Sequence, residues 1–308
     1  MRTLRLLVLV VVVFIPARTQ SPNPFLGRWD FNVTSAGGVG ANWLAVSQTA
    51  QGIQVFFQPT GGHVVPLKDF KIEGSHMTFK PSADTTWDLD AAGGKLTGTQ
   101  KRGDRSLPIT GARAPELPAH PVKAWSKPEA LFNGKNLDGW EPIGDPKNSH
   151  WMVKDGLLVN EAHGDNLKTI RKFQDFKLHF EVNCPDLANS GFYLRGRYEV
   201  QLENEPEGTE PPERGMGSIY GRLAPNPPAP NPKVKRHPGE WDAFDVTFIG
   251  REVTISRNGV LTIDHKIIEG ITGGAIDANE GEPGVFYIQG DHTGGLMFRN
   301  ITVQEPKP

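Results

Sequence analysis

The stretch NSGFYLRGRYEVQLE, residues 189–203, contains the pattern that decides the fold class. Successive side chains of a β-strand point to opposite faces of its sheet. In the first half, apolar residues at 192 and 194 alternate with Tyr193 and Arg195. In the second half, apolar residues at 198, 200 and 202 alternate with three polar residues, Glu199, Gln201 and Glu203. The stretch therefore predicts two β-strands that each have an apolar core face and a polar face.

The same alternation extends through the C-terminal part of the chain, residues 128–305. We predict strands there at 151–153, 157–159, 176–182, 191–195, 198–202, 244–249, 252–257, 260–264, 285–289 and 296–303. The dipeptide Asn258-Gly259 between two of them is a strong hairpin signal. No amphipathic pattern long enough for a three-turn helix is present. Residues 128–305 are therefore predicted to form an all-β sandwich or jelly roll.

The N-terminal part, residues 25–111, also consists of short alternating runs separated by glycine turns. The runs lie at 29–33, 52–56, 63–67, 76–79, 86–89 and 95–99, a spacing typical of a small antiparallel β-barrel or sandwich. No catalytic constellation stands out in this domain, and we expect its isolated His63 and His76 to be ordinary surface or turn residues. Residues 112–127, ARAPELPAHPVKAWSK, are proline-rich and lack periodicity, so we predict a linker.

Composition agrees with two all-β domains. The chain has 35 glycines and 26 prolines among 308 residues, which fits short strands joined by many turns. Its 7 tryptophans and 16 phenylalanines supply enough large apolar side chains for two cores. The 33 Lys and Arg residues nearly balance the 35 Asp and Glu residues. This balance argues against a nucleic-acid-binding protein with a broad basic surface.

Residues 1–20 have the features of a secretory signal. Arg2 and Arg5 precede an unbroken apolar run at 6–15, which as a helix would span only about 15 Å, half of a bilayer core. We therefore predict a cleaved signal and no membrane span in the mature chain. The lone cysteine, Cys184, cannot form an internal disulfide. An exported, disulfide-free protein fits a bacterial periplasmic or secreted location.

The C-terminal domain also predicts a polar site on one sheet face. In 285–289, residues 286 and 288 point inward and Tyr287 and Gln289 outward, with Asp291 and His292 just beyond. A second β-layer would therefore place five polar residues on one face: Arg195, Glu199, Gln201, Glu203 and Gln289. Amides, carboxylates and a guanidinium beside aromatic rings suit sugar hydroxyls and ring faces. A solvated sheet face would show the same alternation, so parity leaves both interpretations open.

Two long loops interrupt this domain, at 204–217 and 223–239. Loops of this length inside a compact domain are commonly functional lids or disordered insertions. They flank Ser218-Ile219-Tyr220-Gly221, which we expect at the mouth of a site.

The spacing Glu199-x-Gln201-x-Glu203 also invites comparison with retaining laminarinase-type glucanases. Those enzymes place a nucleophile and an acid four residues apart on one strand, with an aspartate between them. Gln201 occupies the central position here and cannot carry a charge or share a proton. This departure argues against the glucanase interpretation.

The C-terminal domain closely resembles the 3-keto-disaccharide hydrolase domain family. Eight stretches match in order: LFNGKNLDGW (131–140), WMVKDG (151–156), NSGFYLR (189–195), YEVQ (198–201), SIYG (218–221), PGEW (238–241), NGV (258–260) and FRNI (298–301). Two positions depart from the family pattern. Members commonly carry Asn where this chain has Asp242, and the family's Leu-Gln-Asp-His-Gly appears here, at 288–293, as IQGDHT with one additional residue. Residues 25–111 are outside the resemblance.

The resemblance implies a concanavalin-like β-sandwich that acts on glycosides already oxidised at C3 of the sugar. A C3 ketone acidifies the C2 proton, so a base can remove it and the C1 substituent can then leave. Water adds back to give net hydrolysis, or the enone is released as in a lyase. Such a site needs a base near C2, an electrophile for the C3 oxyanion and a proton donor for the leaving oxygen.

The same resemblance suggests residue roles. We expect Glu199 to act as general base or acid and Arg195 to clamp the oxyanion or the substrate. Asp291 and His292 are candidates for proton transfer or for holding one divalent metal ion that polarises the ketone. The expected substrate-binding residues are Asn189, Gln201, Glu203, Gln289, Tyr220 and Trp241, the last two by stacking on the ring. No metal-ligand spacing comparable to a zinc motif identifies a metal.

Three functions therefore stay open. The leading prediction is an exported hydrolase or lyase of 3-keto-glycosides, with an oligosaccharide or glycoside as substrate. The second is a non-catalytic, lectin-like carbohydrate-binding protein, because sandwiches of this kind bind sugars with the same residue types. The third is an adhesion or structural module. A binding protein would tolerate loss of Glu199 with weakened affinity only, and a structural module would show no saturable sugar binding.

Overall fold

The computed structural model describes residues 23–227 and 229–307. The predicted secretory signal at 1–20 lies outside the described residues. In the described part, the helical segments are three short 3-10 turns, η1 (Pro146–Asn148), η2 (Pro212–Arg214) and η3 (Pro232–Val234). No helix there is long and apolar enough to cross a membrane. All other regular structure is antiparallel β-sheet, so the all-β prediction is confirmed.

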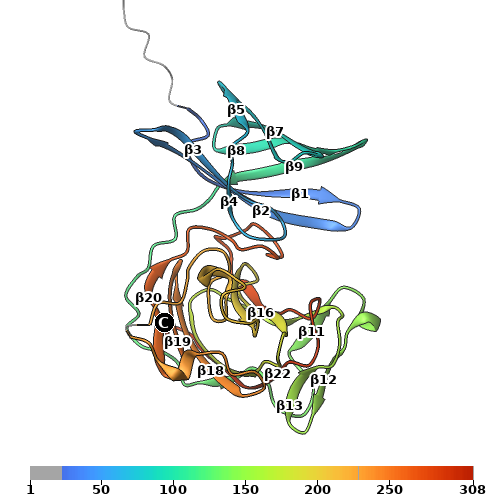
Figure 1. Ribbon diagram of the computed structural model, residues 1–308, viewed down its shortest axis with the longest axis vertical. Helices are drawn as coiled ribbons and strands as arrows, with labels where there is room; N and C mark the ends of the chain where they lie inside the picture. Colours follow the sequence, from blue (N-terminus) through green and yellow to red (C-terminus); the bar gives the residue numbers. More distant parts are fainter. Residues whose placement is uncertain (1–22, 228, 308) are drawn as a thin grey trace, which may run out of the picture.

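The N-terminal part forms one nine-stranded antiparallel sheet in the order β4-β3-β2-β1-β9-β8-β7-β6-β5 (Figure 1). Its strands are β1 (Gly27–Ser35), β2 (Gly38–Thr49), β3 (Gly52–Gln58), β4 (Val65–Pro66), β5 (Phe70–Glu73), β6 (His76–Ser82), β7 (Thr85–Ala92), β8 (Lys95–Arg102) and β9 (Arg105–Arg113). The sheet curls around its own aromatic core, in which the Phe57 and Trp87 ring centroids lie 4.9 Å apart. It stays open, with β4 and β5 as its edges.

The C-terminal part is a sandwich of two sheets, as predicted. One has the order β12-β13-β22-β15-β18-β19-β20, with β10 paired to β22, and the other the order β11-β14-β21-β16-β17. The strands are β10 (Glu129–Ala130), β11 (Trp140–Ile143), β12 (Trp151–Lys154), β13 (Leu157–Asn160), β14 (Asn166–Phe173), β15 (Phe176–Asn183), β16 (Asn189–Leu194), β17 (Tyr198–Glu203), β18 (Trp241–Ile249), β19 (Glu252–Arg257), β20 (Val260–Ile267), β21 (Gly284–Ile288) and β22 (Met297–Gln304). Phe180 and Phe192 stack between the sheets at 4.4 Å.

Six strands were missed by the sequence prediction: β2, β5, β9, β10, β11 and β14. For β14 and β2 the structure shows a physical reason. β14 carries three cationic residues and its pairing with β21 shifts register between Lys168 and Lys172, so its alternation is broken. β2 is apolar on both faces because one face packs on the N-terminal core and the other on the C-terminal domain. A strand buried on both sides loses the period-two pattern by which strands are recognised.

The outer face of β1 and β2 packs against residues 268–283, which join β20 to β21. We call these residues the interdomain segment. Ala41 and Trp43 form a small core with Ile271, Ala275 and Ala278. The interdomain segment therefore lies between the N-terminal sheet and the C-terminal sandwich (Figure 1).

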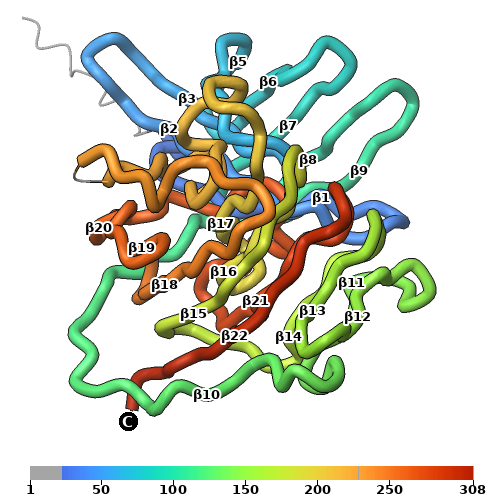
Figure 2. The backbone as a smooth tube through the Cα atoms, turned by 60° about the horizontal axis from the view of Figure 1, so that its bottom comes forward, coloured from blue at the N-terminus to red at the C-terminus, as the bar shows by residue number. Residues whose placement is uncertain are grey.

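The predicted linker is bonded to the C-terminal sandwich along its length. Figure 2 shows it running beside the sandwich towards β10. Arg251 donates its backbone N–H to Leu117 O at 3.0 Å, and Ser126 donates to Glu305 O at 2.8 Å. These bonds hold the linker against the sandwich.

Candidate active site

The five-stranded sheet brings most of the predicted site residues onto one face. In the β16–β17 hairpin, Tyr193 pairs with Glu199, Gly191 with Gln201, and Asn189 with Glu203. Tyr193 also pairs with Tyr287 of β21, and Gln289 follows on the same side. Paired residues of antiparallel strands point to the same face. The opposite face, which includes Phe192 and Val200, packs against the other sheet.

Glu199 is the most deeply placed carboxyl of this face, with 4 % of its surface exposed. Its Oε2 lies 2.8 Å from Tyr193 Oη, and its backbone N–H donates to Thr272 Oγ1 at 3.0 Å. With its amide oriented to satisfy both neighbours, Gln201 donates to Glu199 Oε1 at 3.0 Å. Burial raises the pKa of Glu199 to about 8. The hydrogen bond with Tyr193 partly offsets this rise, and the charges of Asp291 and Glu203 add smaller increases. Glu199 is therefore a neutral acid at pH 7.

Gly191 makes room for this carboxyl. A Cβ placed on Gly191 would lie 2.3 Å from Glu199 Oε1 and 2.7 Å from Glu199 Cγ. The side chain of Glu199 therefore lies directly over the backbone of the neighbouring strand. A single glycine inside a strand pattern is a sequence signal for such a close approach.

Tyr193 has three hydrogen-bond neighbours but one proton. Its Oη lies 2.8 Å from Glu199 Oε2 and 2.7 Å from Gly273 O, and Gln289 Nε2 donates to it at 3.0 Å. The carbonyl of Gly273 can only accept. When Tyr193 donates to Gly273, its contact with Glu199 requires the proton of the carboxyl. The geometry therefore agrees with a protonated Glu199.

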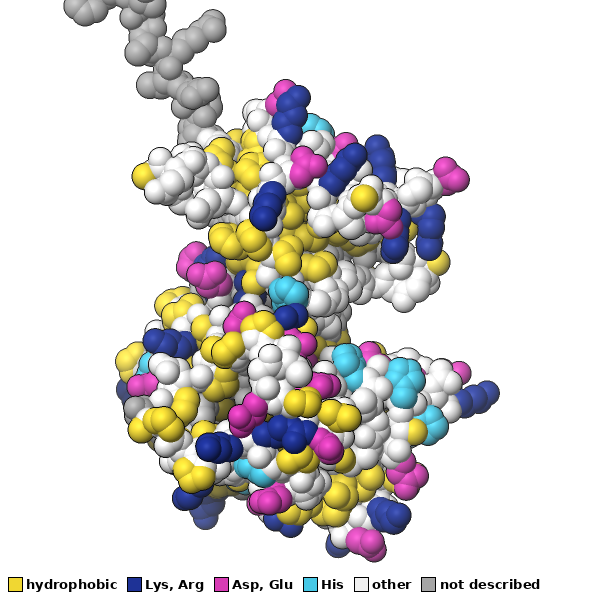
Figure 3. Space-filling view, viewed as in Figure 1, with side chains coloured by type: hydrophobic (Ala, Val, Ile, Leu, Met, Phe, Trp, Pro, Cys, Tyr) yellow, Lys and Arg dark blue, Asp and Glu magenta, His cyan; other side chains and the backbone are white. Residues whose placement is uncertain are grey.

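Asp291 and His292 form a pair in the turn after β21. His292 Nδ1 lies 3.0 Å from Asp291 Oδ1, and Asn166 Nδ2 donates to Asp291 Oδ2 at 3.4 Å. Burial alone would raise the pKa of Asp291. The hydrogen bond and charge of His292 and the hydrogen bond from Asn166 outweigh this effect, so the pKa of Asp291 is lowered. Asp291 is therefore ionised at neutral pH. His163 Nδ1 lies 3.2 Å from His292 O, and Figure 3 shows histidine side chains gathered where β11 and β12 lie.

A cavity of about 400 Å³ opens beside the same end of the sheet. The two long loops predicted from the sequence wall it, through residues that include Glu205, Met216, Pro225 and Arg236, and Glu203 contributes to its lining. Burial raises the pKa of Glu203 to about 7, helped by Glu210 and Glu205 and opposed by Arg214 and Gln201. This carboxyl changes charge near neutral pH.

Asn189 connects the cavity end of β17 to the Asp291 turn. Asn189 pairs with Glu203, and its backbone N–H donates to Thr293 Oγ1 at 2.7 Å. Tyr220 lies nearer to Glu199: it is half-buried and its backbone N–H donates to Glu199 O at 3.1 Å. The structure thus groups Asn189, Glu199, Gln201, Glu203, Tyr220, Gln289, Asp291 and His292 around one sheet face.

Arg195 does not join this group, so the predicted placement on the polar face is wrong. β16 ends at Leu194, and Arg195 has a left-handed φ of 52° that ends the strand alternation. Its buried guanidinium lies 4.8 Å from the Phe248 ring centroid and donates to Tyr198 Oη at 3.1 Å. Both partners belong to the sandwich core. Arg195 therefore lies on the opposite side of the sheet from Glu199.

Trp241 is also remote from the site, and its expected stacking on a sugar ring there is wrong. It begins β18, in the other sheet of the sandwich. Its neighbours Asp242 and Phe244 point inward, so Trp241 points outward, where the Arg299 guanidinium lies 4.0 Å from its ring centroid. A tryptophan in a matching motif reveals its strand but not the face on which it lies.

Sequence reasoning missed Lys168. This residue of β14 pairs with Tyr287 and so shares the polar face, where Lys168 Nζ lies 3.0 Å from Glu141 Oε1. The residue was missed because β14 itself was missed. An alternation search that tolerates one bulge would have found it.

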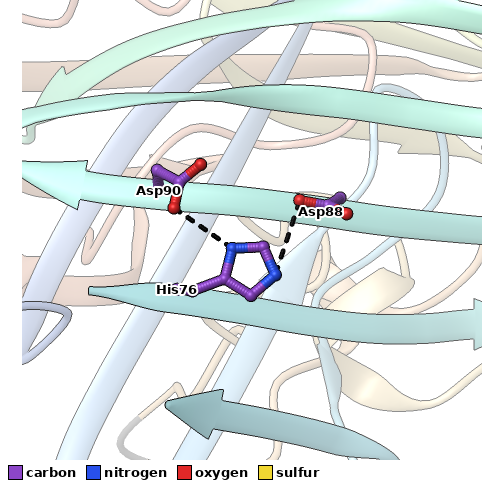
Figure 4. A group of neighbouring side chains, drawn as sticks. All are labelled: His76, Asp88 and Asp90. Carbon is purple, nitrogen blue, oxygen red and sulfur yellow. Dashed lines mark hydrogen bonds and ion pairs between the residues drawn. The ribbon is translucent and has the colours of Figure 1, made fainter. Parts of the chain in front are cut away.

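The divalent metal ion predicted at the Asp291–His292 pair stays a prediction. In the described part of the chain, the one group of three ligating side chains is His76, Asp88 and Asp90 in the N-terminal sheet. There His76 Nδ1 faces Asp90 at 3.1 Å and Nε2 faces Asp88 at 3.6 Å (Figure 4). A ring whose two nitrogens each face a different carboxylate suits polar contacts with those carboxylates better than one shared ion. His76 is thus a surface residue, as expected, with two aspartates as neighbours.

Comparison with known proteins agrees with the motif resemblance. A family model described as a 3-keto-alpha-glucoside-1,2-lyase-like domain matches residues 127–304, and none matches the N-terminal region. Two solved structures from Parabacteroides distasonis, each named a "putative glycosyl hydrolase", are similar to the chain. One is 29% identical, covers 58% of this chain and 83% of its own, and has a TM-score of 0.47. The other is 19% identical, covers 59% and 94%, and has a TM-score of 0.44. A search of curated proteins found no match.

Proposed function

Because the chain belongs to the family of 3-keto-alpha-glucoside-1,2-lyase-like domains, we propose that it is an exported enzyme that cleaves glycosidic bonds of sugars oxidised at C3. The family supports a glycoside-degrading function. We propose in addition that the substrate must carry a C3 ketone, that the residues below have the roles given there, and that the enzyme is periplasmic or secreted.

One arrangement carries the proposal: the buried Glu199 on the sheet face and the Asp291–His292 pair in the turn after β21 belong to one group, in environments that shift the two carboxyl pKa values in opposite directions. Burial keeps Glu199 protonated by raising its pKa, while His292 and Asn166 overcome burial to lower the pKa of Asp291. Titratable groups whose environments push their pKa values apart are the usual pattern of acid–base catalysis. Glu203 adds a third carboxyl, which lines the cavity.

The proposed reaction starts at C2. The ionised carboxylate of Asp291, held by His292, accepts the C2 proton, and the C2–H electrons form an enolate with the C3 ketone. The enolate then re-forms the ketone and a C1=C2 double bond as the C1–oxygen bond breaks. Glu199 gives its proton to the departing oxygen, so the aglycone leaves as an alcohol. The enone is released, or water adds to it and completes a net hydrolysis. General acid–base steps of this kind typically contribute about 10²–10⁴-fold each.

The remaining polar groups of the face would hold the sugar. Gln289 is buried and its Oε1 has no hydrogen-bond partner in the described structure, so it can accept from a sugar hydroxyl. Gln201 and Asn189 supply further amides, and the half-buried Tyr220 can cover the ring. Glu203 can accept a hydroxyl at the cavity. No step here passes through a metal ion.

The test is aglycone release from a chromogenic 3-keto-glucoside beside its unoxidised parent. We expect turnover of the keto compound alone, and a fall of about 100-fold or more in Glu199→Gln. The exposed Glu240→Gln is the matched control and should keep wild-type turnover. A fall of less than tenfold in folded Glu199→Gln would end its assignment as the proton donor. Turnover of the unoxidised parent at the same rate would end the ketone requirement.

The burial of Glu199 favours a second candidate, a lectin-like carbohydrate-binding protein. With 4 % of its surface exposed, Glu199 could serve only to orient Tyr193 and Gln201 for binding. Such a protein would bind sugars saturably and release no aglycone from either compound. Glu199→Gln would then weaken affinity without any loss of rate.

A further inference from the structure

The backbone of Gly273 and Gly274 is bonded on one side to the candidate site and on the other to the N-terminal sheet. On the site side, Tyr193 Oη lies 2.7 Å from Gly273 O, and Tyr287 Oη donates to Gly274 O. On the other side, Gly274 donates its N–H to Thr60 O at 2.7 Å. The two tyrosine rings stack at 3.9 Å between this segment and the sheet. Two residues of the interdomain segment therefore link the phenol beside Glu199 to the other domain.

On the N-terminal side, the link is made by a loop that buried hydrogen bonds hold in place, residues 59–64 between β3 and β4. Gln58 is fully buried, and its Nε2 donates to Pro59 O and Gly62 O at 2.9 Å each. Gly62 O lies so close to Gly273 that a Cβ placed on Gly273 would be 2.0 Å from Gly62 O. The next residue, His63, lies against Gly221 beside Tyr220 and has Nδ1 3.4 Å from Arg214 Nη1. His63 is thus an interface residue and not the isolated surface residue expected from the sequence.

We propose that the N-terminal sheet is a working part of the active site, in which loop 59–64 positions Gly273 and Gly274 and, through Tyr193 and Tyr287, the carboxyl of Glu199. This inference rests on the proposed function for its meaning in catalysis. It gives a role to the region that no family model matches. Loop 59–64 touches no reacting atom in this account, so it is a positioning element and not a catalytic one.

The expected consequence concerns the proton of Glu199. Because Gly273 O and Glu199 Oε2 compete for the single proton of Tyr193, the phenol stabilises an ionised Glu199 less than it would without Gly273. If the segment withdraws, Tyr193 donates to Glu199 alone, and a stronger hydrogen bond to the charged form favours ionisation. The other titratable groups around Glu199 are Tyr287, Tyr220, Asp291 and Glu203, with Arg214 beside Tyr220. His63 of loop 59–64 also lies beside this set, but its ring contacts Arg214 Nη1, at 3.4 Å, and not Glu199. Loosening the contact of Gly273 should therefore act on Glu199 through Tyr193.

Gly273→Ala tests the contact, because the atoms nearest to the added methyl all belong to Gly62. Gly281→Ala is the matched control in the same segment, since its methyl would meet only Pro115, with Cγ nearest at an ordinary 3.7 Å. We expect Gly273→Ala to lose about tenfold or more in kcat. Its pH–rate profile should lose activity at a lower pH than wild type. Gly281→Ala should keep both the rate and the profile.

A second variant guards against misfolding of the first. Gln58→Met removes the two amide donors that hold loop 59–64 and adds nothing against Gly273. It should shift the profile in the same direction as Gly273→Ala. Calorimetry of both full-length variants identifies the folded samples. Wild-type rate and profile in both folded variants would overturn the proposal.

An infrared titration separates this inference from the proposed function. The carbonyl band of protonated Glu199, assigned by its absence in Glu199→Gln, reports ionisation without any substrate. A lower midpoint in Gly273→Ala supports the positioning role even if no keto-sugar is turned over, in which case the proposed function alone fails. Turnover with unchanged midpoints in folded Gly273→Ala and Gln58→Met would leave the function standing and refute the inference.

Discussion

Tyr193 and Glu199 face each other across the β16–β17 hairpin, with Tyr193 Oη 2.8 Å from Glu199 Oε2. The pair is buried, and its proton arrangement depends on a backbone carbonyl, that of Gly273, 2.7 Å from the phenol. A hairpin register thus places a phenol, a carboxyl and a segment from another part of the chain in one chain of hydrogen bonds.

Removing the phenol should make Glu199 harder to ionise. The hydrogen bond from Tyr193 lowers the pKa of Glu199, so in Tyr193→Phe that pKa rises further above about 8. The loss of one charge-assisted hydrogen bond corresponds to about 1–2 pKa units. The infrared titration measures this shift, and Tyr198→Phe, on the core face of the same hairpin, is the control. A midpoint that falls in Tyr193→Phe would contradict the hydrogen-bond assignment.

Filling the space under Glu199 should slow catalysis strongly. In Gly191→Ala, the new methyl would lie 2.3 Å from Glu199 Oε1, so the carboxyl must move. Overpacking of this kind costs about 1–3 kcal/mol of stability. We expect a folded protein with a lower melting temperature and a kcat reduced by about 100-fold. Gly37→Ala, with its nearest neighbour at 3.7 Å, should match wild type. Wild-type kcat in Gly191→Ala would show that the position of Glu199 is not critical.

The direction of the pH dependence distinguishes an acid from a base at Glu199. Its pKa is raised to about 8, so a proton donor loses activity as the pH rises through that value. On the acid side, the lowered pKa of Asp291 keeps the base ionised below the usual aspartate range of about 3.9. The pH dependence of kcat in the wild-type enzyme tests both the alkaline loss of activity and the acid loss. Activity that rises between about pH 7 and pH 9 would assign the base role to ionised Glu199 instead.

The domain interface should weaken as the pH rises. Asp30, on the face of β1 that meets the interdomain segment, is 5 % exposed. Burial, and then repulsion from Glu280, raise its pKa from 3.8 to about 9. The unfolded chain therefore binds fewer protons between these values, so stability is lost as the pH rises from about 4 towards 9.

Asp30→Asn removes this titration and keeps the shape of the side chain. We expect it to raise the melting temperature at pH 8 and to change it less at pH 5, as measured by calorimetry. A variant that is destabilised equally at both pH values would show that the charge of Asp30 does not oppose the interface.

The sequence predicted the all-β class and the grouping of Glu199, Gln201, Glu203 and Gln289, because strand parity is a local property. Parity failed at Arg195, where a left-handed residue ends the strand, and at Trp241, where the matching motif did not reveal the outward face. Lys168 was lost with the bulged strand β14. The contact of loop 59–64 with Gly273 joins residues more than two hundred positions apart, and no local pattern encodes such a contact.

A 3-keto-glucoside that carries deuterium at C2 provides the most direct test of the account. With wild-type enzyme in ordinary water, NMR should show loss of the C2 deuterium together with aglycone release, and a slower rate than for the unlabelled sugar. Both the release and the loss of label should fall sharply in Glu199→Gln. Release of aglycone with the deuterium retained at C2 would contradict the account, because the C1 bond would then break without removal of the C2 proton.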